Sequence, residues 1–173
     1  MKYVSANLYH LQGKTYSAIE TENNFFFGRQ NGDMLETISV FSKDVRFVCN
    51  DSHINVYAIE IIEERLKITV LPQQNEHFFE LSGVDEFVIG LTAGNRSLLI
   101  RTCCDLSDDD QKINMYYIDL MTDRIMLCDD IIMNESYHMP YISFCEDEEY
   151  ISVESAVIYP YEIGAASKDT SYI

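Results

Sequence analysis

The sequence contains no long uninterrupted apolar run. No stretch approaches the roughly eighteen consecutive apolar residues that a membrane-spanning helix requires. Residues 1–11 hold one lysine and then alternate tyrosine, serine, asparagine and histidine with small apolar residues, so they lack the apolar centre of a signal peptide. From both absences we expect a soluble protein of the cytoplasm.

Linker-like segments are also absent, because no stretch rich in Gly and Ser or in Pro divides the chain. The length of 173 residues fits one ordinary domain. A content of 47% hydrophobic and 24% charged residues is typical of a globular protein and not of a disordered or fibrous one. The sequence therefore predicts a single domain over residues 1–173.

Basic residues are scarce: 12 Lys and Arg stand against 29 Asp and Glu, so the formal net charge is −17. The acidic residues are concentrated in residues 101–150, which hold 13 of them and only 3 basic residues. A field of this sign repels phosphate backbones and anionic lipids, so we expect neither direct nucleic-acid binding nor membrane docking. It attracts basic partners, although acidic loops also serve simply to keep a protein soluble.

The five cysteines are an odd number and suggest reduced thiols without a disulfide framework. Cys49, Cys128 and Cys145 end apolar runs and are predicted to be core residues. Cys103 and Cys104 are adjacent, which is not the spacing of zinc ligands. We therefore expect no metal site and no cofactor.

Short runs rich in Ile, Val, Phe and Tyr alternate with turn-forming clusters at intervals of about ten residues, the pattern of antiparallel strands. The predicted fold class is all-β, mostly antiparallel hairpins with little helix. The expected strands are Tyr3–Tyr9, Lys14–Glu20, Asn24–Gly28, Leu35–Phe41, Val45–Cys49, Ile54–Ile61, Arg65–Leu71, His77–Leu81, Phe87–Leu91, Ser97–Thr102, Ile113–Leu120, Arg124–Cys128, Tyr141–Cys145 and Tyr150–Ile158.

Two segments resemble each other, since residues 56–70 and 115–127 each read as a strand, an acidic turn, an arginine and a second strand. We therefore expect a hairpin and not a helix at Ile59–Leu66. The second segment, YYIDLMTDRIML, is similar to the outer hairpin of many β-propeller blades. The strands fit a β-sandwich or a curved, propeller-like arrangement of stacked hairpins.

Sequence motifs for catalysis are missing. The segment from Asp105 resembles a calcium loop, but Asp110 and Tyr116 stand where the required Gly and Glu would be. There is no G-x-S-x-G turn, and the four histidines are scattered without a local link to a nucleophile. We expect a protein that is not an enzyme; the alternative is an enzyme with a spatially assembled site that uses His138 or Cys104.

Small size, acidity, reduced cysteines and the absence of catalytic motifs together suggest a binding protein. In these respects the chain resembles the immunity proteins of bacterial toxin systems, such as contact-dependent growth inhibition. The resemblance implies a one-to-one complex with a cognate basic toxin domain, expected to be a nuclease, whose substrate-binding surface the protein blocks. The other alternative is a self-assembling β scaffold whose exposed strand edges pair between copies.

The residues expected to bind the partner are the acidic clusters of the third quarter and two loop tyrosines that could serve as anchors. They are Asp105, Asp108, Asp109, Asp110, Asp129, Asp130, Tyr137, Tyr141, Glu146, Asp147, Glu148 and Glu149.

Overall fold

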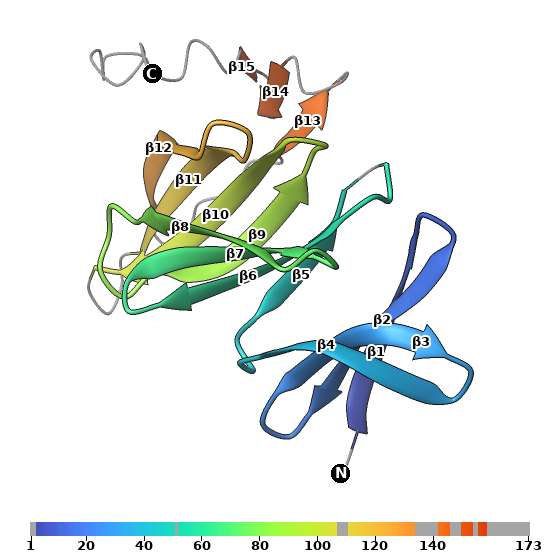
Figure 1. The fold of residues 1–173 in the computed structure, drawn as a ribbon. Helices are drawn as coiled ribbons and strands as arrows, with labels where there is room; N and C mark the ends of the chain where they lie inside the picture. The colour runs from blue at the N-terminus through green and yellow to red at the C-terminus, as the bar shows by residue number, and fades with distance from the viewer. Residues whose placement is uncertain are drawn as a thin grey trace. The chain divides into compact units, whose positions relative to one another are not determined.

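A computed structural model describes residues 3–50, 52–106, 111–133, 142–145, 150–153 and 156–158. These residues form fifteen β-strands and contain no helix, which confirms the predicted all-β class (Figure 1). It follows that no described segment is a helix long and apolar enough to cross a membrane.

The strands form four antiparallel sheets, each built from strands that follow one another along the chain. Sheet A contains β1 (Tyr3–Leu11), β2 (Lys14–Thr21), β3 (Phe25–Asn31) and β4 (Met34–Phe41). Sheet B contains β5 (Arg46–Cys49), β6 (Val56–Ile62), β7 (Arg65–Leu71) and β8 (Asn75–Glu80). Sheet C contains β9 (Phe87–Ala93), β10 (Ser97–Asp105), β11 (Gln111–Asp119) and β12 (Arg124–Met133). Sheet D contains β13 (Ile142–Cys145), β14 (Tyr150–Val153) and β15 (Ala156–Ile158).

Most expected strands appear within three residues of their predicted limits, with two differences. β12 continues to Met133, five residues beyond the predicted end at Cys128. The run expected as a single strand at Tyr150–Ile158 is divided into β14 and β15, which pair with each other. The expected hairpin at Ile59–Leu66 is confirmed, because β6 and β7 are joined by Glu63 and Glu64, both with positive φ (52° and 63°). Two consecutive positive φ angles characterise the tight hairpin turn whose twist matches that of the strands.

The chain divides into two compact units, residues 1–62 with 66–78, and residues 63–65 with 79–173. The first unit has a core formed by one face of sheet A together with residues of sheet B. Phe27 is fully buried there and stacks on Tyr16, with ring centroids 5.7 Å apart. Val56 and Ala58 of β6 supply apolar side chains to the same cluster. A division into compact units does not decide whether both fold as one domain, so the single domain expected from the sequence stays a prediction.

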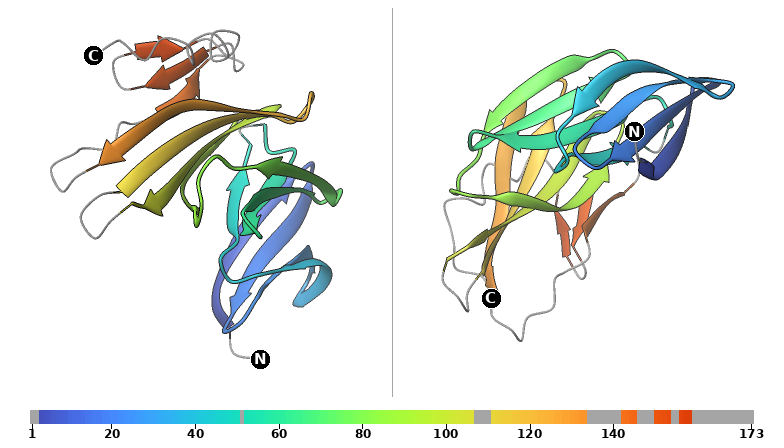
Figure 2. Two further views of the ribbon diagram at one scale, coloured as in Figure 1. Left: turned by 90° about the vertical axis from the view of Figure 1, so that its left-hand side faces the viewer. Right: turned by 90° about the horizontal axis from the view of Figure 1, so that it is seen from below.

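The second unit is built around sheet C, whose strands run side by side and change from yellow-green to orange in Figure 2. Every residue from Ile113 to Ile118 on β11 is buried, although successive residues of a strand point to opposite faces. Both faces of β11 are therefore covered. A strand buried on both faces reads as a continuous apolar run, which explains the sequence INMYYI.

Candidate functional site

The strand order of sheet C determines where the described residues of the predicted acidic set lie. Asp105 ends β10 opposite Gln111, and Gln111 lies opposite Met133 at the end of β12. The Asp105 side chain is exposed, and its Oδ1 accepts a hydrogen bond of 2.9 Å from Nε2 of Gln111. Asp108, Asp109 and Asp110 belong to the segment that connects these two strands in sequence, but they lie outside the described residues.

Two further predicted residues, Asp129 and Asp130, lie on β12. Asp130 is paired with Asn114, and Asp129 with Met115. Because strands rise about 3.4 Å per residue, the backbone of Asp130 lies about 10 Å along the sheet from the level of Asp105. The register thus places Asp105 at the end of β10, whereas the backbone of Asp129 and Asp130 lies near the middle of β12.

The other predicted site residues cannot be compared with the structure. Outside the described residues, besides the three aspartates above, are Tyr137, Tyr141, Glu146, Asp147, Glu148 and Glu149. Their assignment to a binding surface stays a prediction.

An acidic residue at the opposite end of sheet C has a structural role. Asp119 ends β11 and accepts hydrogen bonds from the backbone N–H groups of Met121 and Thr122 and from the Thr122 hydroxyl. Partial burial raises the pKa of Asp119, but these hydrogen bonds and nearby Arg124 outweigh burial and lower the pKa below its usual value. This carboxylate therefore stabilises the β11–β12 turn.

A buried carboxylate forms an extensive polar cluster in the described part of the second unit. Glu86 is only 6% exposed and immediately precedes β9. Its carboxylate accepts hydrogen bonds from Gly83 N–H (2.6 Å), Asn114 Nδ2 (2.9 Å), the Tyr116 hydroxyl (2.8 Å) and the Thr102 hydroxyl. We call these five residues the Glu86 cluster.

The Glu86 cluster joins the loop before β9 to one face of sheet C. Thr102 and Asn114 are directly paired across β10 and β11, so both side chains meet the carboxylate from the same face. Ser82 strengthens this connection, because its N–H donates to the Tyr116 hydroxyl at 3.0 Å and its own hydroxyl lies 2.7 Å from the same oxygen. Asn114 Oδ1 is buried and has no hydrogen-bond partner, and Asn114 itself is fully buried.

Burial raises the pKa of Tyr116 to about 12; hydrogen bonds from Ser82 oppose the rise, and the Glu86 carboxylate adds to it. Tyr116 therefore remains a hydrogen-bond donor at neutral pH. A carboxylate that is surrounded by protein donors and nearly inaccessible to solvent is suited to anchoring a loop and not to receiving a substrate.

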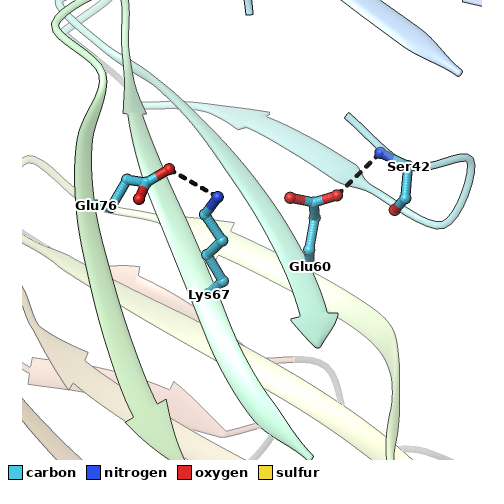
Figure 3. A network of polar contacts seen from close by, with 4 residues as sticks. All are labelled: Ser42, Glu60, Lys67 and Glu76. Carbon is cyan, nitrogen blue, oxygen red and sulfur yellow. Dashed lines mark hydrogen bonds and ion pairs between the residues drawn. The ribbon is translucent and has the colours of Figure 1, made fainter. Parts of the chain in front are cut away.

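Sheet B carries a second polar group, drawn in Figure 3. Glu60 on β6 is 6% exposed and accepts a hydrogen bond of 3.0 Å from the backbone N–H of Ser42. On β7, Lys67 Nζ lies 2.7 Å from Glu76 Oε1 of β8 and 5.9 Å from the centroid of the Phe78 ring. Figure 3 shows the Lys67 side chain between the two carboxylates. The Lys67–Glu76 ion pair links β7 to β8, and the Ser42–Glu60 hydrogen bond links the segment after β4 to β6.

The two adjacent cysteines are buried free thiols. Burial raises the pKa of both thiols; the Asp105 carboxylate adds to the rise at Cys103, and the Glu86 carboxylate adds to it at Cys104, where Lys112 acts in the opposite direction. A raised pKa disfavours the reactive thiolate. The environment of Cys104 therefore does not support its use as a nucleophile.

Two of the three cysteines expected in the core can be compared with the structure. Cys49 is half-buried and packs against the core of the first unit, Cys128 is half-buried, and the side chain of Cys145 lies outside the described residues. Cys49 Sγ lies 3.5 Å from Nδ1 of His53, an exposed residue with a positive φ of 51°. This contact has no recognisable signal in the sequence, because it depends on the conformation of the loop that connects Cys49 to His53.

Among the described residues, no group of three or more His, Cys, Asp or Glu side chains could hold a metal ion. The sequence also gave no warning of the Glu86 cluster, since Glu86 follows Asp85 and resembles an ordinary acidic turn residue. Asn114 is a weak signal, because it is an amide inside an otherwise apolar strand. No protein-family model matches the chain, and no curated protein matches it.

Proposed function

We propose that the protein is an acidic binding protein of the cytoplasm that neutralises a basic partner, as an immunity protein blocks a cognate nuclease toxin. The observation that carries the proposal is the concentration of 13 acidic and 3 basic residues in residues 101–150. Asp105 supports it, because this exposed carboxylate ends β10 and stands close in sequence to Asp108, Asp109 and Asp110. An acidic cluster of this kind can steer a basic domain into a one-to-one complex and compete with nucleic acid for its cationic groups.

The proposal assigns binding and not catalysis to the chain. The Glu86 carboxylate is enclosed by its own loop and sheet, and burial raises the pKa of the Cys104 thiol. Neither group is placed to act on a substrate. The acidic residues of the segment 101–150 therefore form the interaction surface of this proposal.

A pull-down from lysate of the source organism, supplemented with the products of neighbouring reading frames, identifies the partner. We expect one basic nuclease domain, released as salt rises and inactive while bound. Recovery of no basic domain at low salt would count against the proposal.

The interface is tested with two variants of equal charge. One reverses Asp108, Asp109 and Asp110 to Lys; the control reverses three exposed acidic residues of other turns, Asp33, Glu63 and Glu64, to Lys. We expect the first to weaken partner binding about 100-fold and the control to weaken it less than about fivefold, since close charge pairs contribute more than distant ones. Equal effects of both variants would show that only net charge matters and would contradict an interface that includes Asp108, Asp109 and Asp110.

A further inference from the structure

The outer face of sheet A has an unusual composition for a protein with a net charge of −17. The inner face is the one that contributes Tyr16, Ala18 and Phe27 to the core of the first unit. In an antiparallel sheet with one buried face, the opposite face normally carries the polar and charged residues. Here the strand registers place the charged residues differently.

All four charged residues on strands β1–β4 lie on the inner face. Lys14 pairs with the core residue Leu11, and Glu20 pairs with Phe25, which packs on the core. Arg29 pairs with the core residue Tyr16, and Glu36 pairs with Arg29. Because paired residues share a face, the outer face carries no Asp, Glu, Lys or Arg.

Apolar side chains cross the outer face in a continuous row. Ala6 pairs with Ile19, Ile19 with Phe26, and Phe26 with Val40, so the row extends over all four strands. Val40 is 54% exposed, and Leu8, two residues from Ala6 on the same face of β1, is 62% exposed. An exposed apolar surface without charges is typical of the centre of a protein interface.

We propose that the outer face of sheet A packs against the same face of a second copy of this chain. The proposal goes beyond partner neutralisation, since it uses a different surface. It also differs from the expected scaffold, in which strand edges would pair, because here the contact is between sheet faces.

Charge favours a second copy as the occupant. Residues 3–41 hold 2 basic and 4 acidic residues, so 2 − 4 gives −2 of the total −17. Two copies that meet through this face bring together surfaces that carry no Asp, Glu, Lys or Arg, whereas a basic partner finds no carboxylate there. Self-association through any strongly acidic surface would be opposed by repulsion between like charges.

The available area is sufficient for association. Four strands about 4.8 Å apart and about eight residues long, at about 3.4 Å per residue, form a face of about 500 Å². Two such faces bury about 1,000 Å², near the lower limit for a specific interface. We therefore expect a dimer that forms at micromolar concentration.

Sedimentation equilibrium of the full-length chain at several concentrations tests this proposal. The interface variant carries Leu8→Lys and Val40→Lys; the control carries Met34→Lys and Met121→Lys, two methionines more than 70% exposed that do not belong to the outer face of sheet A. Both variants change the net charge by +2 and replace only exposed side chains, so folding is preserved. We expect the interface variant to weaken dimerisation about 100-fold, because its lysines would be buried without partners, and the control to dimerise like the wild type.

Salt distinguishes self-association from partner binding. Screening reduces the repulsion between two chains of charge −17, so dimerisation should be maintained or strengthened as salt rises, whereas binding of a basic partner should weaken. A wild-type chain that is monomeric at about 100 µM, ten or more times the expected dissociation constant, would overturn the proposal. So would a dimer that the interface and control variants weaken equally, because the contact would then lie elsewhere.

Discussion

Removal of the Glu86 carboxylate should strongly destabilise the second unit. In Glu86→Ala, the N–H of Gly83, Nδ2 of Asn114 and the hydroxyls of Thr102 and Tyr116 all lose their acceptor. Ser82 can still pair with the Tyr116 hydroxyl, which leaves three donors without a partner. An unsatisfied buried donor costs about 1–3 kcal/mol, and entry of water into the vacated space offsets part of this, so we expect a loss of about 4 kcal/mol.

Glu86→Gln keeps the shape of the side chain and one acceptor oxygen. Its amide group would face donors that now meet the second carboxylate oxygen, so we expect an intermediate loss of about 2 kcal/mol. The free energy of unfolding is measured by urea denaturation at neutral pH, followed by circular dichroism, with the dependence on urea concentration compared between variants.

The matched control is Glu80→Ala. Glu80 forms an ion pair with Arg65 (Oε1 to Nε 2.8 Å), but its side chain is 77% exposed, so its removal should cost less than about 0.5 kcal/mol. If Glu86→Ala cost no more than Glu80→Ala, the hydrogen bonds of the Glu86 cluster would not stabilise the fold, and the reasoning above would be refuted.

Three further predictions concern pH, backbone packing and thiol reactivity. Since burial raises the pKa of Tyr116 from 10.0 to about 12, its contribution to stability is complete below pH 10 and is lost as pH rises toward 12; unfolding in urea at several alkaline pH values should show a flatter profile for Tyr116→Phe. Gly28→Ala should lower the free energy of unfolding by more than about 2 kcal/mol, because the added Cβ would meet the backbone carbonyl of Glu36 across a β-bulge; a smaller loss would show that the bulge can relax. In the folded protein, a thiol reagent should label buried Cys104 more slowly than half-buried Cys128, as followed by mass spectrometry of peptides, and equal rates would contradict the assigned burial.

The strands could be predicted from the sequence because each carries a local signal. Runs of β-branched and aromatic residues such as residues 56–62 are separated by turn-forming residues, and both properties act over a few positions. The positive φ angles at Glu63 and Glu64 show the limit of this reasoning, since neither residue is a usual choice for such a turn. There, strand pairing on both sides determines the turn.

The Glu86 cluster could not be predicted, because its members come from three separate segments. Glu86 precedes β9, Thr102 lies on β10, and Asn114 lies on β11. Only the register between β10 and β11 makes these side chains neighbours, and register depends on long-range pairing. The uncharged outer face of sheet A could not be predicted for the same reason. Only the register of the four strands shows that Lys14, Glu20 and the other charged residues lie on the same face.

The central claim, that the acidic residues neutralise a basic partner, is tested most directly by the salt dependence of the complex. The purified chain is titrated with the basic nuclease domain recovered in the pull-down, and affinity and nuclease activity are measured together from low to moderate salt. We predict one-to-one binding that inhibits the nuclease and weakens steeply as salt rises. Binding that is independent of salt, or that leaves the nuclease fully active, would contradict the account.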